Sequence, residues 1–272
     1  MIVCADDYGL APDIDEAIVD LASRQQIDAV SVIVASPWCN GTAVEALKTV
    51  ADRVSLGLHL LLIDGIPLAP ADELATLVTA TGFLPHFARL LRRAACGRLK
   101  AAEVQKEVAA QHAAFVRLFG MPPRFIDSHL HTHQFPAVAE GLAAFVLGLD
   151  AARRPHVRNT HVPLAKAIRQ GVSVWKNLGI SLYGRRNRRL LERLGIPTNT
   201  GFGGIYDYRQ YTRYPDYHQR MTAHMESPSG ILMVHPGLKE PWRRSEYDVL
   251  RKTAAPAAGQ RRGFAPAEQK AL

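Results

Sequence analysis

Two adjacent carboxylates near the start of the chain are the first residues whose types and spacing indicate chemistry. Asp6 and Asp7 directly follow residues 2–5, a short apolar run that is typical of a buried strand of a parallel sheet. Because the chain turns where a strand ends, both carboxylates can reach one pocket. Two ionised carboxylates at close range repel each other, so the pair needs a proton or a cation. The alternative is that one of them caps the helix that follows.

Histidines follow three later runs that also have the composition of strands. His59 lies within or at the end of residues 54–62, His129 follows residues 125–127, and His235 follows residues 230–234. In barrel-like α/β folds the carboxyl ends of the strands build the active site, so we expect these side chains to lie near the two carboxylates. A single histidine in such a place is more often structural, but the agreement of four strands favours one shared site.

The segment from Asp127 to His133 has histidines at alternating positions, His129, His131 and His133. In an extended chain alternate side chains lie on one face, which would bring several imidazoles together. Imidazole and carboxylate donors together bind divalent metals such as zinc, iron and nickel, and Asp127 can accept the second ring proton of a ligand histidine. The alternative is a surface histidine cluster that binds metal nonspecifically.

Strands and helices alternate along the chain, which predicts an α/β fold with a parallel sheet covered by helices. The predicted strands are residues 2–5, 29–34, 54–62, 125–127, 156–158 and 230–234, and the predicted helices are residues 14–21, 43–50, 83–119, 136–147, 165–170 and 184–194. Residues 201–204 are predicted to be a glycine-rich loop without the context of a dinucleotide-binding fingerprint. The 272 residues suffice for one large domain, which we expect over residues 1–253, followed by a disordered tail over residues 254–272.

The chain has a formal net charge of +8, part of it concentrated in residues 185–189. We expect no specific nucleic-acid partner, because no nucleic-acid motif or interleaved aromatic pattern accompanies these arginines. Two interpretations stay open, a solvated basic helix face and peripheral contact with an anionic membrane. No apolar run reaches the roughly 20 residues of a membrane span, and no signal-peptide pattern is present. Three widely spaced cysteines suit a reducing compartment, so we expect a cytoplasmic protein.

Taken together, the motifs resemble those of the YdjC-like carbohydrate deacetylases, the family that includes chitooligosaccharide deacetylase. The matching segments are Ala5-Asp6-Asp7-Tyr8-Gly9-Leu10, Gly57-Leu58-His59-Leu60 with Gly65 and Pro67, Asp127-Ser128-His129-Leu130-His131-Thr132-His133 with Pro136, Val157-Arg158, and His235-Pro236-Gly237. The resemblance covers roughly residues 1 to 250, and the chain is similar in particular to the branch associated with hopanoid biosynthesis.

The resemblance implies a distorted TIM-like (β/α) barrel related to polysaccharide deacetylases. It also implies one divalent metal ion, Mg²⁺ or Zn²⁺, held by Asp7, His59 and His129. A homodimer is plausible for the family and is expected on that ground alone.

The resemblance implies that Asp6 is the general base and that His235 is the general acid. Tyr8 stands where phenylalanine is commoner in the family, and keeps an aromatic wall beside the substrate. We expect further substrate contacts from Arg158 and from residues 202–208.

The function that follows is a metal-dependent hydrolase that removes an N-acetyl group from an amino sugar, a glycan or a glycolipid and releases acetate. A metal with three protein ligands keeps open positions for water and for the substrate carbonyl. We expect the nearby cation to hold the pKa of Asp6 down while it accepts the water proton, and His235 to protonate the leaving amine. The alternatives are a metal hydrolase of another amide or of a phosphoester, and a non-catalytic barrel protein associated with carbohydrate or lipid.

Overall fold

A parallel sheet of seven strands forms the centre of the fold in the computed structural model, which describes residues 1–225, 229–253 and 263–264. The strand order is β5-β4-β3-β2-β1-β7-β6, and every pair is parallel. The strands are β1 (Ile2–Tyr8), β2 (Ala29–Val32), β3 (Ser55–Leu60), β4 (Phe125–Ser128), β5 (His156–Val157), β6 (Gly201–Gly203) and β7 (Gly230–Val234). A parallel bridge between Val157 of β5 and Thr198, just before β6, joins the two sheet edges. The predicted α/β fold, a distorted TIM-like barrel, is confirmed.

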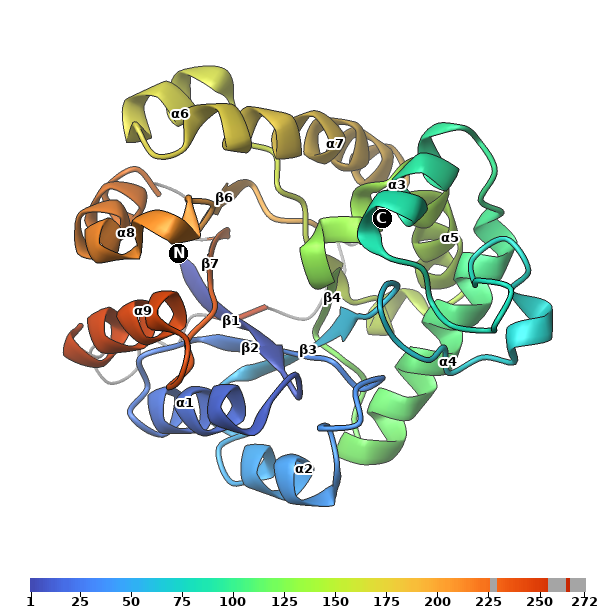
Figure 1. Cartoon of the computed structure of the whole chain (residues 1–272), viewed down its shortest axis with the longest axis horizontal. Helices are drawn as coiled ribbons and strands as arrows, with labels where there is room; N and C mark the ends of the chain where they lie inside the picture. The colour runs from blue at the N-terminus through green and yellow to red at the C-terminus, as the bar shows by residue number, and fades with distance from the viewer. Residues whose placement is uncertain (226–228, 254–262, 265–272) are drawn as a thin grey trace.

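Helices surround this sheet on all sides in Figure 1. In the described part of the chain they are α1 (Pro12–Ser23), α2 (Gly41–Lys48), α3 (Phe87–Ala95), α4 (Ala101–Phe119), α5 (Pro136–Leu147), α6 (Leu164–Gln170), α7 (Val174–Arg193), α8 (Tyr214–Ala223) and α9 (Pro241–Lys252). Short 3₁₀ turns connect some of them, at η1 (Ala71–Glu73), η2 (His129–Gln134), η3 (Ala151–Arg153) and η4 (Tyr208–Arg213). Among the described residues, no helix combines the length and the apolar character that crossing a bilayer requires.

Several predicted elements differ from the structure. The helix predicted at residues 184–194 begins earlier, at Val174, as α7. The predicted loop at residues 201–204 begins as strand β6, which pairs with β7. A Cβ on Gly203 would lie 2.9 Å from Met225 Cε, a clash that the end of this flexible side chain can relieve by shifting. The predicted helical segment 83–119 is two helices, α3 and α4, separated by a turn in which Gly97 has a φ of +66°. Helices α8 and α9 were not among the predicted elements.

The barrel interior is filled by aromatic and aliphatic side chains. The ring of Phe125 lies so close to Gly57 of β3 that a Cβ there would be 2.3 Å from the ring, so only glycine leaves room for it. Phe264 is buried and stacks on Phe125, with ring centroids 4.3 Å apart. Of the predicted tail, residues 254–262 and 265–272 lie outside the described residues, whereas Phe264 contacts the barrel core.

Candidate active site

A bulge in β1 brings Asp6 and Asp7 to one cavity. The pairing of β1 with β2 shifts by one residue between Ala5 and Tyr8, so β1 contains one residue more than its partner. Asp7 has a φ of 70°, in the left-handed region that few residues other than glycine adopt. Both carboxylates line the same cavity as a result. The chain turns as predicted, although it does so within β1 rather than beyond its end.

Three side chains from three strands converge beside this bulge. Asp7 Oδ1 lies 3.4 Å from Nε2 of His59, in β3, and 2.9 Å from Nδ1 of His129, which follows β4. One donor atom from each residue lies within 4.8 Å of the other two. A carboxylate and two imidazoles are donors that suit a divalent transition metal, so these residues fit the implied metal ion.

Asp127 fixes the orientation of the His59 ring. His59 Nδ1 lies 2.7 Å from Asp127 Oδ1 and 3.1 Å from the hydroxyl of Ser31, which also donates to Asp127. The other ring nitrogen, Nε2, is thereby directed toward Asp7. Burial alone lowers the pKa of His59, but Asp127, Asp7 and Asp6 together raise it to about 10. The predicted role of Asp127 behind a ligand histidine matches this geometry.

Arg243, in the first turn of α9, holds the second oxygen of Asp7. Its Nη2 lies 2.7 Å from Asp7 Oδ2, and its guanidinium group stacks over Trp242 at 4.4 Å. Burial raises the pKa of Asp7, but the hydrogen bonds and charges of His129, His59 and Arg243 hold it well below its ordinary value. One oxygen of Asp7 is therefore fixed by the arginine, and the other faces the two histidines.

Arg158 binds Asp6 through two hydrogen bonds. Its Nη1 and Nη2 lie 2.5 and 2.7 Å from the two carboxylate oxygens, and Nη2 is also 2.5 Å from Asp127 Oδ2. All three side chains are fully buried. Burial raises the pKa of Asp6 above its ordinary value, and Arg158 opposes this shift without outweighing it. We expect a nearby metal cation to hold the pKa of Asp6 down. The protein's own groups do not lower it, because the cost of burying the carboxylate outweighs the effect of Arg158.

The cavity above these groups has a volume of about 450 Å³. Polar groups form one side of it, and apolar side chains from several helices form the rest. Tyr208 and Trp242 stack at 4.3 Å and make an aromatic wall. The lining residues are Asp6, Asp7, His59, Phe87, Ser128, His129, Leu130, His131, Lys176, Ile180, Ile205, Tyr208, Met233, His235, Trp242 and Arg243.

His235 follows β7 and lines this cavity beside the aromatic wall. Its ring lies edge-on to Tyr208 and to Trp242, each at 5.9 Å. Its backbone N–H donates to the buried carboxylate of Glu246. Burial, reinforced by the charge of Arg243, lowers the pKa of His235 to about 3. The ring is therefore neutral at neutral pH.

The histidine segment after β4 is coiled rather than extended. Leu130 and His131 both have left-handed backbone angles, with φ of 52° and 56°, inside the 3₁₀ segment η2. His129 faces the carboxylates and His131 lines the cavity, whereas the Nδ1 atom of His133 pairs with the hydroxyl of Ser128 at 2.8 Å. Because the segment is not extended, alternate imidazoles do not all share one face: His129 and His131 line the cavity and His133 does not.

The structure places Tyr8 and Arg158 outside the lining of this cavity. The Tyr8 hydroxyl donates to the carbonyl of Ala43 in α2 at 2.6 Å. Arg158 lies beneath the carboxylates, with 1% of its surface exposed. Of the predicted contact loop, residues 202–208, Ile205 and Tyr208 do reach the cavity.

Sequence reasoning missed several lining residues, among them Lys176, Trp242 and Arg243. Pro241 at the first position of α9 is a helix-start signal that would have located this helix. Nothing local marks Arg243 as a partner of Asp7, because 236 positions separate them in the chain.

The sequence matches the family described as YdjC-like protein over residues 1–261. A mouse protein named carbohydrate deacetylase is 32% identical over 178 residues, which cover 64% of this chain and 53% of that protein. A Serratia marcescens protein named chitooligosaccharide deacetylase is 33% identical over 145 residues, which cover 53% of this chain and 54% of that protein. The chain thus spans about half the length of the curated relatives it matches.

A crystal structure from Enterococcus faecalis V583 has a similar fold, with a TM-score of 0.65. That protein is named for cellobiose-phosphate cleavage, and the superposition covers 93% of this chain and 91% of that one. At 18% sequence identity, the likeness concerns the fold alone.

Proposed function

The chain belongs to the YdjC-like protein family, and from this we propose that it is a metal-dependent carbohydrate N-deacetylase. The reaction removes an acetyl group from an N-acetylated amino sugar or glycan and releases acetate. One observation carries the proposal: Asp7, His59 and His129 converge beside a second carboxylate, Asp6, in a single cavity. The relatives named carbohydrate deacetylase and chitooligosaccharide deacetylase support the choice of an amide over other bonds.

Asp7, His59 and His129 would hold one divalent metal ion, for which Mg²⁺ and Zn²⁺ are the candidates. Bound there, such an ion supplies an activated water and polarises the acetamide carbonyl. The protein prepares the site through Arg243 and Asp127. Arg243 fixes Asp7 so that one oxygen stays directed at the histidines, and Asp127 fixes the His59 ring.

Asp6 is the proposed general base. Its raised pKa suits the task, because a carboxylate that binds protons more tightly is a better acceptor. Arg158 is better assigned to positioning Asp6 than to contacting substrate, since its guanidinium group is buried and occupied by Asp6 and Asp127. The two hydrogen bonds from Arg158 keep Asp6 ionised and fixed until it accepts a proton.

His235 is the proposed general acid for the leaving amine. Because its ring is neutral at neutral pH, His235 does not carry the transferred proton at the start of the reaction. It must receive that proton during the reaction before it passes it to the amine. Asp6 is the source of that proton, because it accepts one from the water. Tyr208 and Trp242, in contact with the ring of His235, present a flat apolar wall to the sugar.

Acetate release from N-acetylated oligosaccharides, measured with and without chelator, tests the proposal. Asp6→Asn should bind metal as the wild type does and lose activity by about 10² or more, because a general base contributes roughly that factor. His129→Ala should lose both metal and activity. The matched control is Asp72→Asn, at an exposed position, which should keep both. Near-native turnover by Asp6→Asn would contradict the assignment of Asp6 as the general base. Acetate release that is unaffected by chelator would contradict the proposed metal dependence.

We further propose a cytoplasmic location, because Cys4, Cys39 and Cys96 are all free thiols, as a reducing compartment permits. A homodimer and a glycolipid form of the substrate stay predictions, as does the link to hopanoid biosynthesis.

A further inference from the structure

The outer side of α6 and α7 exposes large apolar side chains that the proposed deacetylase site does not use. Trp175 is 86% exposed and Leu182 is 74% exposed in α7, and Leu164 and Ile168 of α6 are more than half exposed. Soluble proteins rarely expose several such side chains together without a partner. We define the α6–α7 face as Leu164, Ile168, Trp175, Leu182, Arg186, Arg189 and Arg193.

The α7 part of this face is a single stripe along the helix. Trp175, Leu182, Arg186, Arg189 and Arg193 recur at intervals of seven, four, three and four residues, so at 100° per residue they share one side. The stripe is apolar in its first half and basic in its second half. It extends over about 27 Å of helix.

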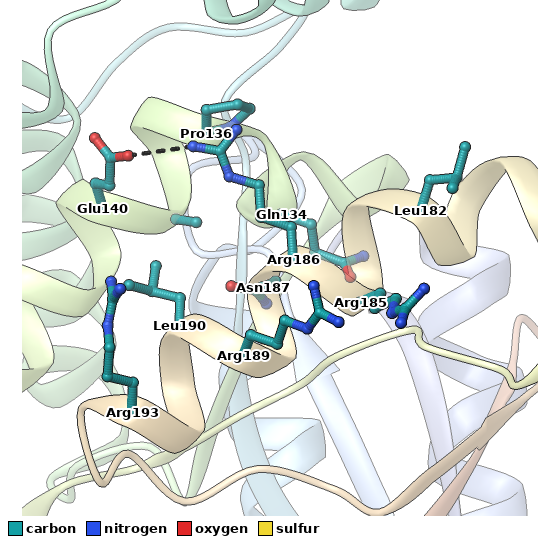
Figure 2. A pocket seen from close by; sticks show the side chains of 11 residues that line it. Gln134, Pro136, Glu140, Leu182, Arg185, Arg186, Asn187, Arg189, Leu190 and Arg193 are labelled. Atoms are coloured by element: carbon teal, nitrogen blue, oxygen red, sulfur yellow. Dashed lines mark ion pairs between the residues drawn. The ribbon is translucent and has the colours of Figure 1, made fainter.

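The basic half borders a cavity of about 360 Å³ between α5 and α7. Figure 2 shows Arg185, Arg186, Arg189 and Arg193 around it, with Glu140 of α5 on the opposite side. Arg186 lies 3.6 Å from Glu140 in a weak pair, since both side chains are more than half exposed, and the other three arginines have no acidic partner among the residues that line the cavity. The cavity therefore has the charge and the donors to receive an anionic phosphate group.

We propose that the α6–α7 face docks on an anionic lipid bilayer. Helices that lie at membrane interfaces carry exposed tryptophan and leucine together with arginine, and in α7 these side chains follow one another along one side. Trp175, Leu182 and the two apolar residues of α6 enter the interfacial layer, and the arginines bind lipid phosphates. The net charge of +8 adds a long-range attraction to such a surface.

A bilayer fits this face better than a second copy of the chain does. In a two-fold contact between two α7 helices, the arginines of one copy meet apolar residues or arginines of the other. Glu140 is the acidic residue that lines the basic cavity, and it is already paired with Arg186. A dimer would thus bury arginine charge without neutralising it, whereas lipid phosphates supply the missing charge.

Lys176 and Ile180 of the same helix line the active-site cavity, so the docked protein holds that cavity near the membrane surface.

Co-sedimentation of the full-length protein with vesicles tests the proposal. The wild type should bind phosphatidylcholine vesicles that contain phosphatidylglycerol, should not bind pure phosphatidylcholine, and should dissociate at high salt. Arg186→Gln/Arg189→Gln should bind about 30-fold more weakly, at one lost lipid contact per arginine. The matched control, Arg98→Gln/Arg117→Gln, removes the same charge from exposed positions elsewhere and should weaken binding far less.

The apolar half is tested separately. Trp175→Ser/Leu182→Ser should weaken vesicle binding about tenfold or more, because it removes the inserted side chains. Vesicle binding should also shift tryptophan emission to the blue in the wild type, and less so in Trp175→Phe. The proposal fails if the wild type ignores anionic vesicles, or if the arginine control weakens binding as much as the test variant. It also fails if sedimentation velocity shows a dimer that Trp175→Ser/Leu182→Ser converts to monomer, since the face would then be a subunit interface.

Discussion

Replacing Arg158 by methionine should destabilise the folded protein strongly and in a pH-dependent way. Arg158 is fully buried, and its guanidinium group binds the buried carboxylates of Asp6 and Asp127 at 2.5 to 2.7 Å. Arg158→Met leaves the Asp6 carboxylate buried without its cation and removes one of the two cationic groups beside Asp127. Removing one partner of a buried ion pair costs about 3 to 5 kcal/mol, and we expect a loss in this range at pH 7.

The sign of the pH dependence follows from the protons bound. Without Arg158, burial raises the pKa of Asp6 in the folded state further above the value of about 3.9 that holds in the unfolded chain, whereas Asp127 keeps the hydrogen bonds of His59 and Ser31. The folded variant then binds more protons than the unfolded chain, so its stability falls as pH rises above about 4. The deficit relative to the wild type should therefore be larger at pH 7 than at pH 5.

Urea unfolding followed by circular dichroism at both pH values measures this deficit. The control Arg117→Met, at an exposed position, should change the free energy of unfolding by less than about 0.5 kcal/mol. The triple variant Arg158→Met/Asp6→Asn/Asp127→Asn should recover part of the loss, because no buried charge is left unpaired. A deficit below about 1 kcal/mol at pH 7, or one that is equal at pH 5, would refute the reasoning from burial.

Three further predictions concern other parts of the molecule. Burial raises the pKa of Asp15 to about 6, so its ionised carboxylate lowers the stability of the folded protein as pH rises from about 4 to 6. In thermal unfolding, Asp15→Asn should be more stable than the wild type by about 1 to 3 kcal/mol at pH 8 but not at pH 4. Gly204 has a φ of +110° and a Cβ there would lie 2.1 Å from Met233 O, so Gly204→Ala should lose about 3 kcal/mol or more in urea unfolding. His129→Ala should weaken zinc binding at least about 100-fold in calorimetry, whereas His131→Ala, which removes a cavity histidine outside the ligand set, should weaken it far less; equal losses would contradict the ligand set.

The carboxylates and the metal-ligand candidates form one connected network. Asp127 contacts Nδ1 of His59 and forms an ion pair with Arg158, and Arg158 in turn binds Asp6. Asp127, which orients His59, and Asp6, the proposed base, therefore bind the same arginine, Arg158. Substitutions within this network should therefore be non-additive, because each changes the charge that its neighbours experience.

The sequence by itself determined six of the seven strands and the positions of the chemistry. Apolar β-branched runs predict the strands, and the titratable residues at the ends of four of them predict one shared site. This works because strand periodicity and the polar residue at a strand end are local properties of the chain. Asp6, Asp7, His59 and His129 do meet in one cavity, as that argument requires.

Tertiary structure alone decided which partners hold those groups and which histidines face them. Arg158 binds Asp6 across 152 positions and Arg243 binds Asp7 across 236, and no local pattern encodes such pairs. The left-handed turn at Leu130 and His131, which separates His129 from His133, likewise depends on packing within the barrel. A local pattern fixes which elements form, whereas contacts between distant residues are fixed only when those elements pack.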